Sequence, residues 1–168
     1  MFILGPKRKA QDPRALDTAF KRYMAYLEAN RGRLSASLYE VATSEWYYNF
    51  DDPRCPHDAA LEYAKLSETV RDDDISARKV SISIKLQSWQ YGDKITYSFH
   101  YSDVHSYRIE SSHQFIAQRT WRYDEFRLSD EGANVVHEIE WAGTGNWLIE
   151  ASDVQFCCDI PPSSQTRQ

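Results

Sequence analysis

The sequence predicts an α+β fold in a single domain, with three N-terminal helices packed on one face of a twisted, mainly antiparallel five-stranded sheet. In the first 70 or so residues, apolar side chains recur with the period of a helix, and after Ala77 they alternate with the period of a strand. Short turns separate the strands, whereas parallel pairs would need crossovers of about a dozen residues or more. We therefore expect the five strands to form a meander.

The expected helices have recognisable start signals. Asp12 and Pro13 form an N-cap and first-turn pair, because Asp accepts from free backbone N–H groups and Pro supplies the helical φ. A second helix is expected to begin near Ser37, where Glu40 three residues later completes a capping box. The third helix is expected over residues 56–70.

The expected strands alternate apolar with polar residues, which is typical of a sheet with one buried and one solvated face. They span residues 80–87, 95–101, 118–128, 135–141 and 147–156. Asp130 and Glu131 are placed at the centre of a four-residue hairpin loop. Only residues 110–117 form a long connection.

A curved, cone-like sheet wrapped on helices is the alternative architecture. This succession of helices and strands resembles the nuclear-transport-factor-2-like folds, and the resemblance implies such a cone. That family usually has a short strand between its helices, whereas the pattern here predicts all three helices before the sheet.

The domain is expected to span residues 12–160, between a flexible basic N-terminus (1–11) and a disordered polar tail (161–168). Three cysteines, two of them adjacent, are too few for a disulfide framework, which favours a reducing, cytoplasmic setting. No apolar run approaches the ~20 residues that cross a bilayer, so no membrane association is expected.

Charge is unevenly distributed along the chain. Residues 1–33 carry eight Lys/Arg against three Asp/Glu, a net charge of +5. Residues 34–168 carry twelve against twenty-two, a net charge of −10. Because this acidic body would repel a phosphate backbone, we expect no nucleic-acid binding through it.

Common catalytic motifs are absent from the sequence. It contains no glycine-rich phosphate loop, no GxSxG elbow and no CxxC pair. His137 and Glu138 are followed by Ile-Glu-Trp, so they do not complete a zincin HExxH motif. We expect no cofactor and no metal site.

Acidic and aromatic residues suggest a binding surface. Carboxylates on two neighbouring strands form an acidic strip, which is unfavourable unless a cation or a basic partner relieves it. In the expected register Glu125 lies near His137 and Asp124 near Glu138. The helical sequence Trp-Tyr-Tyr at 46–48 cannot bury all three rings on one side, and Tyr is favoured in recognition surfaces. The expected surface comprises Tyr47, Tyr48, Asp124, Glu125, His137, Glu138 and Glu140.

An alternative site lies on the strand that contains Tyr101. Alternation places Tyr101, Asp103, His105 and Tyr107 on one face. Asp103 would orient His105 as a general base, and a tyrosine would polarise a substrate oxygen. This pattern predicts a small-molecule-binding protein or an acid–base enzyme, with a pocket on the inner face of the sheet.

We give priority to a non-enzymatic protein-binding module that presents an acidic, aromatic surface to a basic partner. In its general profile the chain is similar to bacterial immunity proteins, which are small, acidic, single-domain proteins that neutralise a toxin. This likeness concerns composition and architecture only.

Overall fold

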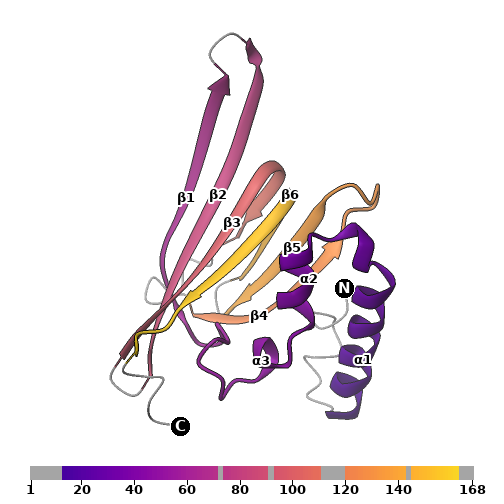
Figure 1. Cartoon of the computed structure of the whole chain (residues 1–168), viewed down its shortest axis with the longest axis vertical. Helices are drawn as coiled ribbons and strands as arrows, with labels where there is room; N and C mark the ends of the chain where they lie inside the picture. The colour runs from indigo at the N-terminus through magenta and orange to yellow at the C-terminus, as the bar shows by residue number, and fades with distance from the viewer. Residues whose placement is uncertain (1–12, 72–73, 91–92, 111–119, 143–144, 163–168) are drawn as a thin grey trace.

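The computed structural model describes residues 13–71, 74–90, 93–110, 120–142 and 145–162. Its described part contains a few helices and a six-stranded antiparallel sheet (Figure 1). The α+β class is therefore confirmed, and the predicted count of five strands is wrong. The expected flexible segment 1–11 and most of the expected tail lie outside the described residues.

The helices precede the sheet. They are α1 (Pro13–Ala29), the 3-10 turn η2 (Arg31–Arg33), α2 (Ala36–Thr43) and α3 (Glu45–Tyr48). The first predicted helix is confirmed from Pro13, whereas its predicted N-cap, Asp12, lies outside the described residues. The second begins two residues earlier than expected, because Ser35 and not Ser37 is its N-cap and accepts the Leu38 N–H at 3.4 Å.

The third predicted helix is wrong, because residues 60–71 form strand β1 (Ala60–Arg71). Its sequence contains helix formers such as Ala, Leu, Glu and Lys, but local propensity is a weak preference that tertiary context overrides. Here β1 pairs along almost its whole length with β2 (Asp74–Gln90). Pairing with the long alternating strand β2 therefore makes residues 60–71 a strand and not a helix.

The remaining strands are β3 (Asp93–Ile109), β4 (Trp121–Leu128), β5 (Val135–Trp141) and β6 (Gly145–Asp159). Their order in the sheet is β1-β2-β3-β6-β5-β4, so the predicted meander is wrong. The chain leaves β3, resumes at the far edge in β4, and returns through two hairpins until β6 pairs with β3. The long connection predicted at 110–117 is the one sign of this crossover in the sequence.

The β4–β5 hairpin has a different register from the predicted one. Leu128 pairs with Val135, and the loop between them is closed by the Ser129 N–H, which donates to the Asn134 carbonyl at 2.9 Å. The loop is thus two residues longer than expected. As a result Glu125 lies opposite Glu138, and His137 lies opposite a phenylalanine.

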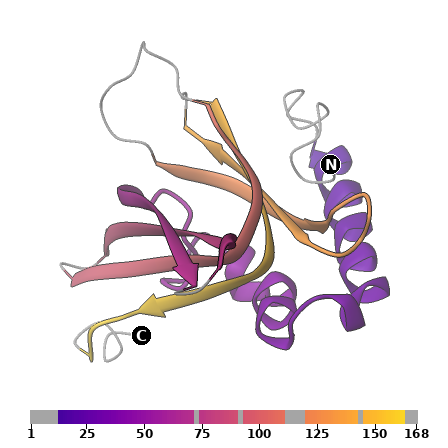
Figure 2. The same cartoon turned by 90° about the horizontal axis from the view of Figure 1, so that it is seen from above.

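A bend divides the long strands β3 and β6, as Figure 2 shows. Asp103 has a positive φ of 48°, and a register shift follows between Val104 and Ser106. Such a bulge kinks a strand and increases its twist. Strand β2 pairs with β3 only as far as Tyr101, so the two strands separate at the bend.

The far ends of β1 and β2 form a two-stranded arm, comprising residues 65–71 and 74–81. Figure 1 shows this arm rising beyond the other strands, whereas the helices lie toward β4, β5 and β6. Almost every described side chain of the arm is exposed or half-buried. The core lies instead between the helices and the rest of the sheet, where Tyr23, Leu27, Leu38 and Tyr47 are buried.

Helix α1 covers the β4 edge of the sheet. On β4, the outward Phe126 N–H donates to the hydroxyl of Tyr23 at 2.7 Å, and the Leu128 N–H donates to that of Tyr26 at 2.8 Å. Both tyrosines belong to α1, so this helix covers the free backbone of the β4 edge. Covering an edge in this way prevents it from pairing with another chain.

We predict that Tyr23→Phe destabilises the protein by about 1–3 kcal/mol, because it leaves the buried Phe126 N–H without an acceptor. Chemical denaturation measures the free energy of unfolding. Tyr26→Phe is the matched control: its hydroxyl is only partly buried, so water can replace it and the loss should be smaller. Equal stability of Tyr23→Phe and the parent would contradict the edge-covering role.

Candidate functional site

A buried carboxylate lies at the centre of the described core. Asp124 on β4 is only 7 % exposed. Its Oδ2 accepts from the Tyr47 hydroxyl at 2.7 Å and from His137 Nε2 at 2.9 Å, and its Oδ1 accepts from Trp121 Nε1 at 2.9 Å. Three donors from three elements therefore satisfy one desolvated charge.

The network continues through His137. Because Asp124 can only accept, His137 Nε2 carries the proton, and its Nδ1 accepts from the Tyr101 hydroxyl at 2.7 Å. Burial lowers the pKa of His137, and the hydrogen bond to Asp124 opposes this effect without reversing it. The imidazole is thus neutral with a fixed tautomer. Burial, followed by the charge of Asp124, also raises the pKa of Tyr101, which stays protonated.

Aromatic rings enclose this network. Phe126 stacks on the His137 ring at 4.0 Å between centroids, and Tyr101 stacks at 5.8 Å. Neither His137 nor Tyr101 is exposed to solvent. A Tyr–His–Asp series resembles an acid–base relay, but a substrate could not reach these atoms. Its chemical role here is to connect elements within the core.

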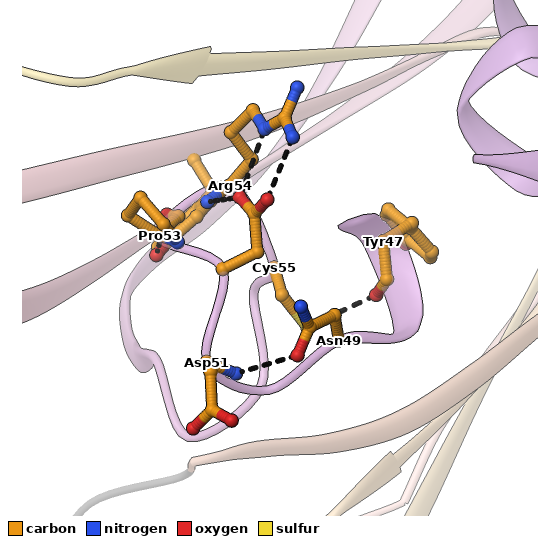
Figure 3. A network of polar contacts seen from close by, with 8 residues as sticks. Tyr47, Asn49, Asp51, Pro53, Arg54 and Cys55 are labelled. Carbon is orange, nitrogen blue, oxygen red and sulfur yellow. Dashed lines mark hydrogen bonds and ion pairs between the residues drawn. The ribbon is translucent and has the colours of Figure 1, made fainter. Parts of the chain in front are cut away.

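A loop closes the core beside Asp124, and Figure 3 shows its polar contacts. The Cys55 thiol donates to the Tyr47 carbonyl at 3.0 Å, which holds the loop against α3. Arg54 donates to Asp52 at 2.9 and 2.7 Å, and the Asp51 N–H donates to the Asn49 side chain at 3.1 Å. Burial raises the pKa of Cys55 to about 12, so this thiol is not a nucleophile near neutral pH.

A cavity of about 30 Å³ lies under this loop, which is room for about one water molecule. His57 lines it, stacked on Phe50 at 3.8 Å, with Nδ1 3.1 Å from Asp58. A larger open hollow of about 690 Å³ runs along α2 and contains none of the predicted site residues. Cys55 also lines the small cavity, but its thiol donates to the Tyr47 carbonyl.

The predicted binding surface is not formed. Tyr47, Asp124, Glu125, His137 and Glu138 are all buried, with exposed fractions of 7 % or less. Only two of the seven predicted residues, Tyr48 and Glu140, are half-buried. The strip was expected to face solvent or a partner, whereas the register and the covering helices place it inside.

The aromatic residues near α3 are buried by different neighbours. This four-residue helix lies between α1 and the sheet, so Tyr48 packs edge-on against Phe20 at 5.0 Å and Trp46 packs against Phe156 at 5.9 Å. The Tyr48 hydroxyl donates to the Ala42 carbonyl at 2.8 Å. We expected one of these rings to face a partner because one side of a helix cannot bury all three. Here α1 packs against Tyr48 and β6 packs against Trp46, so neighbours on different sides cover them.

Glu125 and Glu138 form a cross-strand pair of buried carboxyl groups. Burial, followed by the negative charge of Glu125, raises the pKa of Glu138. Arg127 lies 3.8 Å from Glu138 and partly offsets these effects. Within the described ranges no group of three or more His, Cys, Asp or Glu side chains is placed to hold a metal ion.

The alternative pocket around Asp103 and His105 is not assembled either. Asp103 pairs with Lys79 at 2.8 Å, and His105 is exposed with Nε2 3.3 Å from the Ser152 hydroxyl. Tyr107 is 51 % exposed, whereas Tyr101 is fully buried. The bulge after Asp103 interrupts the alternation that was used to place these four side chains on one face.

The exposed apolar side chains gather on other parts of the molecule. On β1, Leu66 is 48 % exposed, Val70 is 49 % exposed, and Tyr63 is 46 % exposed. Leu66 lies opposite the buried Ile82 of β2, so Leu66 and Val70 continue the apolar face of the sheet onto the arm. Sequence reasoning missed this surface because residues 56–70 were predicted to be a helix.

Comparison with protein-family models, with curated proteins and with solved structures finds no match to this chain. No described helix combines the length and the apolar character needed to cross a membrane.

We predict that Asp124→Asn destabilises the protein by about 3 kcal/mol, because an amide NH2 replaces an acceptor that buried donors require. Equilibrium unfolding in urea measures the loss. The exposed Asp51→Asn is the matched control and should change stability by less than about 0.5 kcal/mol. If both variants lose the same amount, the network does not stabilise the core.

We also predict that stability declines as the pH falls. Burial lowers the pKa of both His137 and His57 in the folded protein, whereas both titrate near about 6.5 when unfolded. The unfolded state therefore binds protons first, and the unfolding free energy drops below that pH by up to about 1.4 kcal/mol per pH unit per imidazole.

Urea unfolding at pH 7.5 and 5.5 tests this prediction. The difference between the two values should shrink in His137→Gln, which removes one titrating ring. The raised pKa of Glu138 acts in the opposite sense, since it favours the folded state at low pH, so the variant is compared with its parent. An unchanged difference would refute the contribution of His137.

Proposed function

We propose that this chain is a non-enzymatic protein-binding module whose docking element is the β1–β2 arm. The observation that carries the proposal is the exposure of Leu66 and Val70, which extend the apolar face of the sheet beyond the covered core. Full burial of a Leu or Val side chain contributes about 1.5–3 kcal/mol. Covering these half-exposed residues would therefore contribute about 1 kcal/mol each.

Two further features support a binding role over a catalytic one. The acid–base alternative required Asp103, His105 and a tyrosine to lie together. Instead Asp103 is paired with Lys79, and Tyr101 is hydrogen-bonded to His137. The Tyr–His–Asp series is sealed in the core. The arm, in contrast, contributes little to the described core, so its shape and its exposed apolar residues need another explanation.

The charge of the partner is not determined by the acidic strip, because most of that strip is buried. A basic partner was predicted from it, and the arm gives that prediction no support. A toxin-neutralising protein of the bacterial immunity type is the specific version that we propose, on the small size and the net charge of −5.

We predict that Leu66→Lys/Val70→Lys abolishes capture of a stoichiometric partner from a host extract while leaving the fold intact, because these side chains are already half in water. Capture by the tagged parent and by the variant is compared at low and high salt. A decrease of at least tenfold is expected.

The matched control is Leu16→Lys/Trp89→Lys, which replaces two apolar residues that are 37 % and 69 % exposed outside the arm. It should retain the partner. Equal capture by the arm variant, or the absence of any stoichiometric partner of the parent, would overturn the proposed function.

A further inference from the structure

Among the described residues, strand β1 is an edge strand whose outer backbone is paired only at its start. There the Trp121 N–H donates to the Ala59 carbonyl at 2.8 Å, and Ala60 forms an isolated bridge with Thr120. From Leu61 to Arg71 no described strand pairs with its outer edge. The β4 edge, in contrast, is covered by two tyrosine hydroxyls.

An edge of this length that no described strand covers is unusual, because unpaired N–H and C=O groups act as a template for another strand. The ligand that satisfies such groups in a regular series is an extended polypeptide. On β1 the two faces differ. Leu66 and Val70 lie on one face, on either side of Glu68, which is ion-paired with Arg78 at 3.2 Å, and Lys65 lies on the opposite face.

A second copy of this chain does not suit the edge. A symmetric antiparallel pair must place the same face of both copies on the same side, so paired residue numbers sum to an even value. If Leu66 pairs with Leu66 of the second copy, the two Lys65 side chains become diagonal neighbours across the strands. If Ser67 pairs with Ser67, the two Glu68 side chains become diagonal neighbours. Like charges at these cross-strand positions oppose pairing.

One register would match opposite charges. It places Lys65 against Glu68 of the other copy, but their numbers sum to an odd value, so their side chains would lie on opposite faces. Symmetric self-pairing therefore cannot use the charge complementarity of this strand.

We propose that β1 accepts an extended segment of a different protein as a seventh strand, a mode of binding that rests on the proposed function. The segment carries apolar residues at alternate positions, facing Leu66 and Val70. Its intervening residues are acidic or hydroxylated, because Lys65 has no ion-pair partner among the described residues. Main-chain hydrogen bonds supply affinity, and the alternating side chains supply specificity.

Hydrogen exchange of the full chain, resolved to single amides by NMR, tests this mode. The probe is a twelve-residue synthetic peptide that alternates valine with glutamate and threonine. Exchange should slow at least tenfold at alternate amides between Tyr63 and Val70. The control peptide has the same composition but groups its valines together, and it should give no alternating pattern.

The proposal is overturned if the peptide slows exchange only at amides outside β1, or if millimolar peptide slows exchange at no amide. So does a concentration-dependent dimer with β1 protected in the absence of peptide, since a second copy would then be the occupant. A partner captured as described above serves as a second probe. If it binds through Leu66 and Val70 but leaves every β1 amide unprotected, strand addition is wrong while the protein-binding function stands.

Discussion

The desolvated carboxylate of Asp124 constrains the rest of the core. A buried charge costs several kcal/mol unless donors meet it, and here the donors come from α3, β5 and the start of β4. His137 passes the constraint on to Tyr101 in β3. The short helix α3, the β4–β5 hairpin and the central strand β3 must therefore take fixed positions relative to one another. The polar core thus helps to specify the arrangement of these elements, in addition to stabilising the fold.

The described part of the molecule has a half that the helices cover and a half that they leave open. Helix α1 seals the β4 edge through two tyrosine hydroxyls, and α2 and α3 cover the neighbouring strands. Beyond the bend at Asp103, β1 and β2 leave the helices and continue alone (Figure 1). The open half presents exposed apolar side chains and, on β1, an outer edge that no described strand pairs with beyond Ala60.

The bend at Asp103 also explains why the predicted pocket around Asp103 and His105 was not assembled. Tyr101 and Tyr107 lie opposite the buried Val154 and Ile149 of β6. Strand β2 pairs with β3 only as far as Tyr101, however, so Tyr101 is buried whereas Tyr107 is 51 % exposed. In the β4–β5 hairpin, Glu125 pairs with Glu138 and not with His137 as expected. Such a shift changes which side chains lie opposite one another, so candidate pairs derived from an assumed register fail even when the strands themselves are right.

The sequence by itself determined the α+β class, the first helix and the strands with clear alternation, because these depend on local periodicity. It did not determine the strand at 60–71, whose composition also suits a helix and whose state was decided by pairing with β2. The strand order depended on where the chain resumed after β3, which no local pattern encodes. Asp124, Tyr101 and His137 were each singled out as candidate residues. Only the tertiary structure brought them together in one buried network, because hydrogen bonds between distant segments depend on how the strands pair.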